Sequence, residues 1–248
     1  MTLRHPLTRL LLACLPALLA IGCSAAPGRP TEDSIPVDPD KVSDFALLFQ
    51  QNCSGCHGAE GKHGAALAIG DPVYLAIAGD ATLRKVITNG IPRTSMPPFA
   101  QSAGGMLTEK QVDVLVGGIR QRWGKPGVLA GVTPPPYAAS EAGDATHGAA
   151  AFATFCASCH GPEGKGTAKG SSIVDGTFLS LLTDQELRTL IIVGRPDLGA
   201  PDWRSNVPGR AMSSQEISDV VAWLAAQRPK FAGRPYPQTA LIAGEKSQ

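Results

Sequence analysis

Apolar residues recur at helical spacing at the end of each half of this chain. After Thr108 and after Ser213 they follow an i, i+3, i+4, i+7 pattern, which places them on one face of a helix. Thr108 and Ser213 are hydroxyl residues with an acidic residue in the following turn, as is typical of a helix N-cap. We therefore predict two amphipathic helices, with inward-facing Val112, Leu115, Val116 and Ile119 in the first and Ile217, Val220, Val221 and Leu224 in the second.

Shorter stretches of the same kind precede these two helices. They predict helices over 42–52 and 81–89 in the first half, and over 146–155 and 184–193 in the second. The predicted fold class is therefore all-α. Each half should contain three to four helices.

The two halves are copies of one unit. Cys53-Ser-Gly-Cys-His57 and the Gly-Ala-Glu-Gly-Lys that follows recur from Cys156 as Cys-Ala-Ser-Cys-His160 and Gly-Pro-Glu-Gly-Lys, an offset of 103 residues. Further matches continue at offsets of 104 and 105, a drift that loop insertions produce. Such an internal repeat predicts tandem domains. We expect them at 41–123 and 144–228, joined by a Pro- and Gly-rich linker at 124–143 and followed by a tail at 229–248.

The first residues have the pattern of an export signal. Arg4 and Arg9 precede an apolar stretch over 10–21 that is too short to span a bilayer comfortably. It ends at Gly22-Cys23, which resembles a bacterial lipoprotein signal. We therefore expect a signal peptide at 1–22, lipid on Cys23 and a flexible tether at 23–40, so that the protein is anchored on the periplasmic side of a bacterial membrane. The alternative is an ordinary signal peptide cut elsewhere, with Cys23 incidental.

Composition narrows the class of protein. The length of 248 residues suits two domains of roughly 100 residues each. The 22 basic and 21 acidic side chains give a net charge of +1, so no basic excess points to nucleic acid. The 28 glycines and 21 prolines suggest short helices joined by long irregular loops, which a covalently bound prosthetic group would hold in place.

The repeated Cys-x-x-Cys-His is the attachment motif of c-type haem. Two thiols three residues apart can each add to one vinyl group of a porphyrin, and the adjacent imidazole can then bind the iron. A disulfide, a redox dithiol or half of a zinc site could use one such motif. Zinc would need both cysteine pairs to converge on one ion, and it gives the repeat no role. We predict two haem c groups, held by Cys53 and Cys56 with His57, and by Cys156 and Cys159 with His160.

Each half resembles a class I c-type cytochrome over about 41–123 and 144–228. The shared features are the motif near the start, the Gly-x-x-Gly-Lys loop after it, and a closing helix that carries aromatic residues. In that family a methionine before the last helix, commonly followed by proline, is the sixth iron ligand. Met96, followed by Pro97, matches that position, and the resemblance implies that it ligates haem 1.

The second copy departs from this pattern. The residue 104 positions after Met96 is Ala200, whose methyl group cannot bind iron, and no histidine follows His160. The remaining methionine downstream is Met212, which aligns with Leu107. It is therefore either a core side chain or a ligand brought in by a re-routed loop at 204–210. Our hypothesis is that Met212 ligates haem 2, because no other sulfur or imidazole is available there. A third possibility is an open or lysine-ligated iron. We expect His63 and His147 to face solvent.

The resemblance implies a two-haem electron-transfer protein rather than an enzyme. Its expected partners are other redox proteins: a quinol-oxidising complex, a terminal oxidase or other cytochromes of a respiratory or photosynthetic chain. A haem enzyme or ligand sensor that uses an open haem 2 is one alternative, and a cytochrome subunit of a periplasmic dehydrogenase is another. The absence of a distal histidine in the second copy argues against peroxidase-like catalysis.

Overall fold

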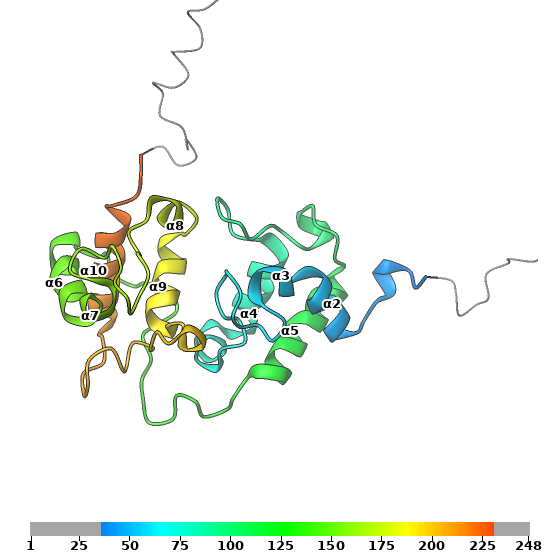
Figure 1. Cartoon of the computed structure of the whole chain (residues 1–248). Helices are drawn as coiled ribbons and strands as arrows, with labels where there is room; N and C mark the ends of the chain where they lie inside the picture. The colour runs from blue at the N-terminus through cyan, green and yellow to red at the C-terminus, as the bar shows by residue number, and fades with distance from the viewer. Residues whose placement is uncertain (1–35, 231–248) are drawn as a thin grey trace, which may run out of the picture. The chain divides into compact units, whose positions relative to one another are not determined.

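The structure is a computed structural model that describes residues 36–230. In this range the chain is helical, with isolated backbone bridges and no β-strand, so the predicted all-α class is confirmed. The helices follow the same order twice along the chain (Figure 1). The first set is α2 (Phe45–Asn52), α3 (Ser54–His57), α4 (Pro72–Asn89) and α5 (Glu109–Trp123). The second set is α6 (Ala145–Phe155), α7 (Ala157–His160), α8 (Gly176–Ser180), α9 (Asp184–Val193) and α10 (Ser214–Ala225).

Three one-turn 3-10 helices complete the description: η2 (Pro39–Lys41), η3 (Gln101–Ala103) and η4 (Pro196–Leu198). The chain divides into two compact units, and the second, which begins at Ser43, contains both helix sets. In the described part of the first unit, the Asp38 carboxylate caps η2 by accepting a hydrogen bond from the Asp40 backbone N–H. Among the described residues, no helix combines the length and apolar character that crossing a membrane requires.

The predicted closing helices begin where their caps indicate. Thr108 is the N-cap of α5 and forms a capping box with Gln111, and Ser213 does the same for α10 with Glu216. In each case the hydroxyl accepts the N3 backbone N–H, and the N3 side chain accepts the N–H of the cap residue. The helix that begins at Asp184 is likewise capped by Thr183, with a capping box to Glu186.

The middle helix of the first copy is longer than the sequence suggests. The prediction covers 81–89, whereas α4 begins at Pro72 after an Asp71 N-cap and has a kink at Gly79, where φ is +63°. The second copy separates the same two segments into α8 and α9. The kink explains the difference, because it breaks the apolar periodicity that the prediction relied on.

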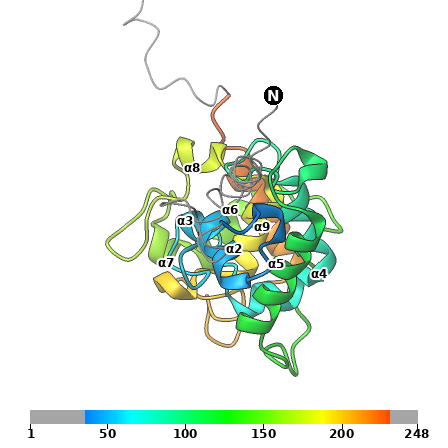
Figure 2. The same ribbon diagram turned by 90° about the vertical axis from the view of Figure 1, so that its right-hand side faces the viewer.

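In each copy the first and last helices pack together, and aromatic rings fill the contact. α2 lies against α5 and α6 lies against α10, as Figures 1 and 2 show. Trp123 of α5 meets Phe45 and Phe49 of α2 with ring centroids 5.9 Å and 4.9 Å apart. Trp223 of α10 stacks on Phe152 of α6 at 4.3 Å. The inward-facing residues predicted for α5 and α10 are all buried.

The linker is fastened to the second copy by a buried arginine. Arg188 of α9 donates from Nε and Nη2 to the Pro136 carbonyl oxygen at 3.1 and 3.0 Å, and Gln185 donates to the Tyr137 carbonyl at 2.8 Å. The same guanidinium donates to the hydroxyls of Ser214 and Ser218, so its donors are satisfied inside the protein. The end of the linker is therefore a bound segment.

Candidate functional sites

The first Cys-x-x-Cys-His motif forms a tight helical turn at the end of α2. Cys53 is the C-cap of α2 and the N-cap of α3, and the residues of α3 then carry Cys56 and His57. The i, i+3 spacing brings the two cysteines to the same side of the turn. Both are free thiols, Cys53 buried and Cys56 exposed.

A single hydrogen bond fixes the orientation of His57. Its Nδ1 lies 2.8 Å from the Leu67 carbonyl oxygen. Because a carbonyl oxygen can only accept, Nδ1 carries the proton and the lone pair of Nε2 is free to bind a metal. The His57 side chain is 9% exposed, and burial lowers its pKa, which favours the neutral imidazole that metals bind.

The second motif repeats this geometry. Cys156 is the C-cap of α6, α7 carries Cys159 and His160, and both cysteines are half-buried free thiols. The Nδ1 of His160 lies 2.7 Å from the Ser171 carbonyl oxygen, so its Nε2 is free as well. Two segments 103 residues apart thus position the same three side chains in the same way.

The first thiol of each motif lacks the lowered pKa of a reactive redox cysteine. Burial raises the pKa of Cys53 to about 12 and that of Cys156 to about 11, with a smaller contribution from the neighbouring cysteine in each case. A reactive dithiol needs a lowered pKa, since the thiolate is the nucleophile. Each copy therefore offers two cysteine thiols and an imidazole with a free Nε2, a donor set that fits a haem held by two thioethers and one nitrogen ligand.

A compact turn holds Met96 in the first copy. The Ile91 N–H donates to the Met96 carbonyl at 2.9 Å, and the Met96 N–H donates to the Thr94 hydroxyl at 3.1 Å. Pro97 and Pro98 follow and stiffen the exit from the turn. Met96 is half-buried on this turn, between α4 and α5 in the chain.

The corresponding turn of the second copy is closed by the same backbone hydrogen bond and has a different residue at the ligand position. The Arg195 N–H donates to the Ala200 carbonyl at 3.0 Å, so Ala200 stands where Met96 stands in the first copy. The alignment of Ala200 with Met96 is thus matched by equivalent hydrogen bonds.

Met212 occupies the place of Leu107. Its N–H donates to the Trp203 carbonyl at 2.9 Å, as the Leu107 N–H donates to the Phe99 carbonyl at 2.7 Å. The two side chains are 3% and 5% exposed. This equivalence favours the packing role that the sequence left open for Met212. Its ligation of haem 2 stays a prediction.

Comparison with known families agrees with the repeated site. Residues 40–117 match the family described as cytochrome c oxidase, cbb3-type, subunit III, and residues 145–228 match the cytochrome c family. The chain therefore consists of two tandem c-type cytochrome domains, which imply two covalently bound haem c groups.

One curated relative matches about half of this chain. The chain is 29% identical over 150 residues to the Cbb3-type cytochrome c oxidase subunit CcoP of Azospirillum sp. (strain B510), an alignment that covers 54% of this chain and 45% of the relative. The chain thus spans less than half the length of that relative.

Two solved structures show weaker likeness. A chain of the reducing HAO-like protein complex of Kuenenia stuttgartiensis aligns with 82% of this chain, and the alignment includes 99% of that chain. The two are 16% identical, with a TM-score of 0.42. Thiosulfate dehydrogenase from Marichromatium purpuratum covers 93% of this chain and is covered to 55%, at 22% identity and a TM-score of 0.29. These scores are too low to define a shared arrangement of the whole chain.

The other predicted residues fall into two groups. Cys23, with the signal peptide, lies outside the described residues, as does most of the predicted tether and tail. His63 and His147 are exposed, as the sequence suggests. The sequence analysis did not identify Arg195 and Asp197, which contact the loop after the first motif. The available signal was a pair of opposite charges on the turn that lacks the methionine.

Proposed function

We propose that this protein passes single electrons between membrane redox complexes of a respiratory chain, either as a carrier or as a bound subunit of one complex. The observation that carries the proposal is the paired orientation of His57 and His160, each donating Nδ1–H to a loop carbonyl and leaving Nε2 for iron. Bound haem supplies a one-electron couple at each site. The protein holds the ligands, excludes water and sets the distance between the sites.

The proposed attachment residues follow from the motifs. Cys53 and Cys56 form the thioethers of haem 1, and Cys156 and Cys159 form those of haem 2. His57 and His160 are the proximal ligands, and Met96 is the distal ligand of haem 1. A haem with protein ligands on both faces has no open coordination position, so the first domain is suited to electron exchange through the haem edge.

The respiratory context comes from the relative. CcoP is named as a subunit of a cbb3-type cytochrome c oxidase, and this chain covers 45% of it. The proposed partners are therefore a quinol-oxidising complex or another cytochrome as donor, and a terminal oxidase as acceptor. A place as the cytochrome subunit of a periplasmic dehydrogenase is the alternative within the same chemistry.

The test is kinetic. The purified holoprotein should be reduced by a quinol-oxidising complex, and its reoxidation by a terminal oxidase should be followed by the absorbance of ferrous haem. Turnover of both steps at the rate of the native membrane supports the proposal. Reduction without reoxidation by any oxidase, but with electron uptake from a periplasmic dehydrogenase, favours the alternative.

We propose membrane attachment through Cys23, on the periplasmic side. The support is the sequence alone: a charged start, a short apolar stretch and Gly22-Cys23. Mass spectrometry of the mature N-terminus should find a diacylglyceryl-modified Cys23, and Cys23→Ala should release the protein from membranes into the soluble fraction. An unmodified N-terminus at another residue contradicts this assignment.

A second candidate function is ligand binding at haem 2. The specific observation is Ala200 at the position of Met96, with Met212 packed like Leu107. Carbon monoxide binding to the reduced protein at one haem per chain, abolished by removal of the second motif, supports an open site. A fully low-spin protein that binds no carbon monoxide excludes it.

A further inference from the structure

The distal turn of the second domain has Ala200 at the ligand position and carries two charged residues, Arg195 and Asp197. Arg195 occupies the position of Ile91, as the equivalent hydrogen bonds of the two turns show, and Asp197 follows in η4. The turn keeps the hydrogen bond that closes it, and Ala200 cannot serve as an iron ligand. The contacts of Arg195 and Asp197 indicate a different role for this turn.

These side chains reach the loop that follows the first haem-binding motif. Arg195 donates from Nη1 to the Ala66 carbonyl at 3.1 Å and from Nη2 to the Gly64 carbonyl at 3.0 Å. The Asp197 Oδ2 accepts a hydrogen bond from the His63 backbone N–H at 2.8 Å. Residues 63–66, here called the receptor loop, thus have three backbone groups bound by the second domain.

The two charged residues also bind each other. Arg195 Nε donates to Asp197 Oδ1 at 2.9 Å and Nη2 donates to Oδ2 at 2.8 Å, which is a bidentate pair. Their side chains are only 15% and 2% exposed. Charges that are removed from water in this way must be paired and hydrogen-bonded, and here the receptor loop supplies the remaining partners.

The receptor loop leads directly to the support of the first proximal ligand. Leu67, whose carbonyl accepts the Nδ1–H of His57, is the next residue after Ala66. The second domain therefore binds the first domain one residue away from Leu67, whose carbonyl orients the proximal ligand His57.

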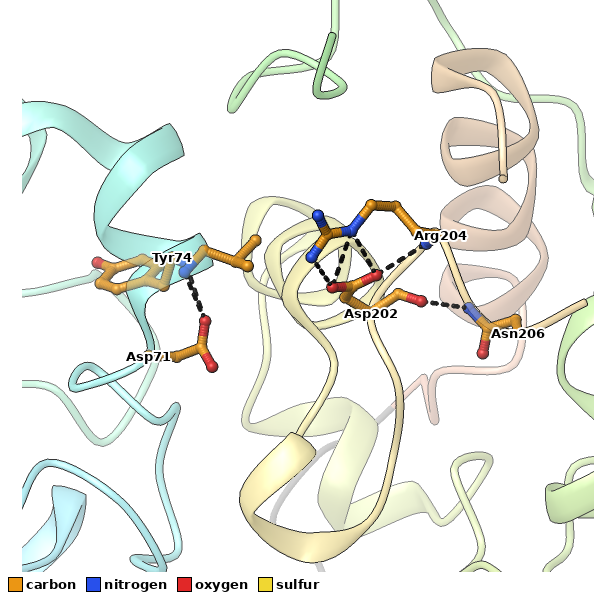
Figure 3. A network of polar contacts seen from close by, with 6 residues as sticks. Asp71, Tyr74, Asp202, Arg204 and Asn206 are labelled. Carbon is orange, nitrogen blue, oxygen red and sulfur yellow. Dashed lines mark hydrogen bonds and ion pairs between the residues drawn. The ribbon is translucent and has the colours of Figure 1, made fainter. Parts of the chain in front are cut away.

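A second charged group lies beside this contact. Arg204 pairs with Asp202 at 2.5 Å, and the Asn206 side chain donates to the Asp202 carbonyl (Figure 3). Asp71, the N-cap of α4 in the first domain, faces this pair in Figure 3. The pKa of Arg204 is raised chiefly by the hydrogen bond to Asp202, with a contribution from the charge of Asp71. α4 and α9 are in contact as well.

We propose that Arg195 and Asp197 form an interdomain docking pair, which holds the receptor loop and fixes the second haem domain against the first for direct electron transfer between them. Both are positioning residues, because they act through backbone groups and not on a haem. The part of the proposal that concerns transfer rests on the proposed function, whereas the docking itself does not.

The geometry makes the docking specific to arginine. A guanidinium presents fixed, diverging donors that can reach two carbonyls and a carboxylate at once, and a lysine ammonium cannot reproduce that fork. Arg195→Gln removes the charge and the fork, Arg195→Lys keeps the charge alone, and Asp197→Asn removes the carboxylate that pairs with the arginine. Arg210→Gln is the matched control, since Arg210 pairs with Glu216 inside the second domain.

The experiment uses the full-length holoprotein. Small-angle X-ray scattering should give a larger radius of gyration for Arg195→Gln and Asp197→Asn, an intermediate value for Arg195→Lys, and the wild-type value for Arg210→Gln. After photoreduction of one haem, electron equilibration between the haems should be several-fold slower in Arg195→Gln, with both reduction potentials measured alongside to separate distance from driving force.

The size of the variants and their rate of electron equilibration can each contradict the docking pair. Wild-type dimensions and wild-type equilibration in Arg195→Gln and Asp197→Asn overturn the docking pair. If Arg195→Gln loses the ferrous spectrum of a folded cytochrome, Asp197→Asn, which keeps the arginine and its contacts to two carbonyls, gives the answer. Expanded variants in a protein that delivers no electrons to membrane complexes would support docking and contradict the proposed function, so the two failures are distinguishable.

Discussion

Phe45 lies directly against Gly118 where the first and last helices of the first domain cross. A Cβ added to Gly118 would come within 2.1 Å of the Phe45 ring. In the second domain the equivalent positions are Gly148 and Trp223, so the large and small residues are exchanged. A Cβ on Gly148 would come within 2.0 Å of the Asp219 carbonyl oxygen and 2.8 Å of the Trp223 Cβ. Both domains thus build the same crossing with one aromatic residue and one glycine, placed on opposite helices.

This packing predicts that alanine has opposite effects on stability at Gly118 and at its neighbour Gly117. Gly118→Ala should lower the free energy of unfolding of the first domain by about 1–3 kcal/mol, because the ring has to move out of a packed contact. The control is Gly117→Ala on the same helix, where an added Cβ meets nothing within 4 Å. It should stabilise by up to about 1 kcal/mol through helix propensity. Denaturant unfolding of the holoproteins measures both, and equal effects at 117 and 118 would contradict the packing.

Met96 should be the residue that sets the spectrum and potential of haem 1. Met96→Ala removes the thioether, so haem 1 should lose its low-spin ferrous spectrum, bind carbon monoxide and show a lower reduction potential. Met106→Ala is the control, because Met106 is 78% exposed. Spectroelectrochemical titration distinguishes the two. An unchanged haem 1 in Met96→Ala refutes the assignment.

Met212 allows a clear choice between packing and ligation. If it packs like Leu107, Met212→Leu should keep the spectrum of haem 2 and cost less than about 1.5 kcal/mol, whereas Met212→Ala should cost about 2–5 kcal/mol through the cavity it leaves. If it is the sixth ligand, both variants convert haem 2 to a high-spin form that binds carbon monoxide. Absorbance spectra and denaturant titrations of the same samples separate these two results.

The ion pair at Asp197 predicts a dependence of stability on acid pH. The hydrogen bond from Arg195 lowers the pKa of this carboxyl from 3.8 to about 2. A depressed pKa contributes stability that is fully present above the ordinary value and is lost as the pH falls from about 4 through about 2. The stability difference between wild type and Asp197→Asn should therefore shrink over that range. Denaturant unfolding at several pH values measures this difference. A stability difference that stays constant from pH 5 to pH 2 would contradict the prediction.

Sequence patterns predicted the elements that depend on local chemistry. The caps Thr108 and Ser213, and the apolar faces that follow them, were readable because an N-cap hydroxyl and a 3.6-residue period are local signals. The haem-binding motifs were equally local. The start of α4 at Pro72 was missed because the kink at Gly79 interrupts the period. The carbonyls that orient the histidines, Leu67 and Ser171, come from backbone and leave no trace in residue type.

The docking pair is an example of a contact that sequence patterns do not predict. Arg195 and Asp197 contact backbone groups about 130 residues earlier in the chain, and no sequence pattern encodes the acceptor. Alignment with the first copy locates the departure at Ala200, but only the fold reveals what the turn contacts. Long-range contacts to backbone are therefore the part of this site that sequence could not supply.

The central claim is that one haem is covalently bound in each repeat. Intact-mass spectrometry of protein matured with the cytochrome c assembly machinery should give the polypeptide plus two haems. The double variant Cys53→Ala with Cys56→Ala should carry one haem, and so should Cys156→Ala with Cys159→Ala. A wild-type mass without covalent haem, or a loss of both haems that leaves a folded protein in either double variant, would contradict the account.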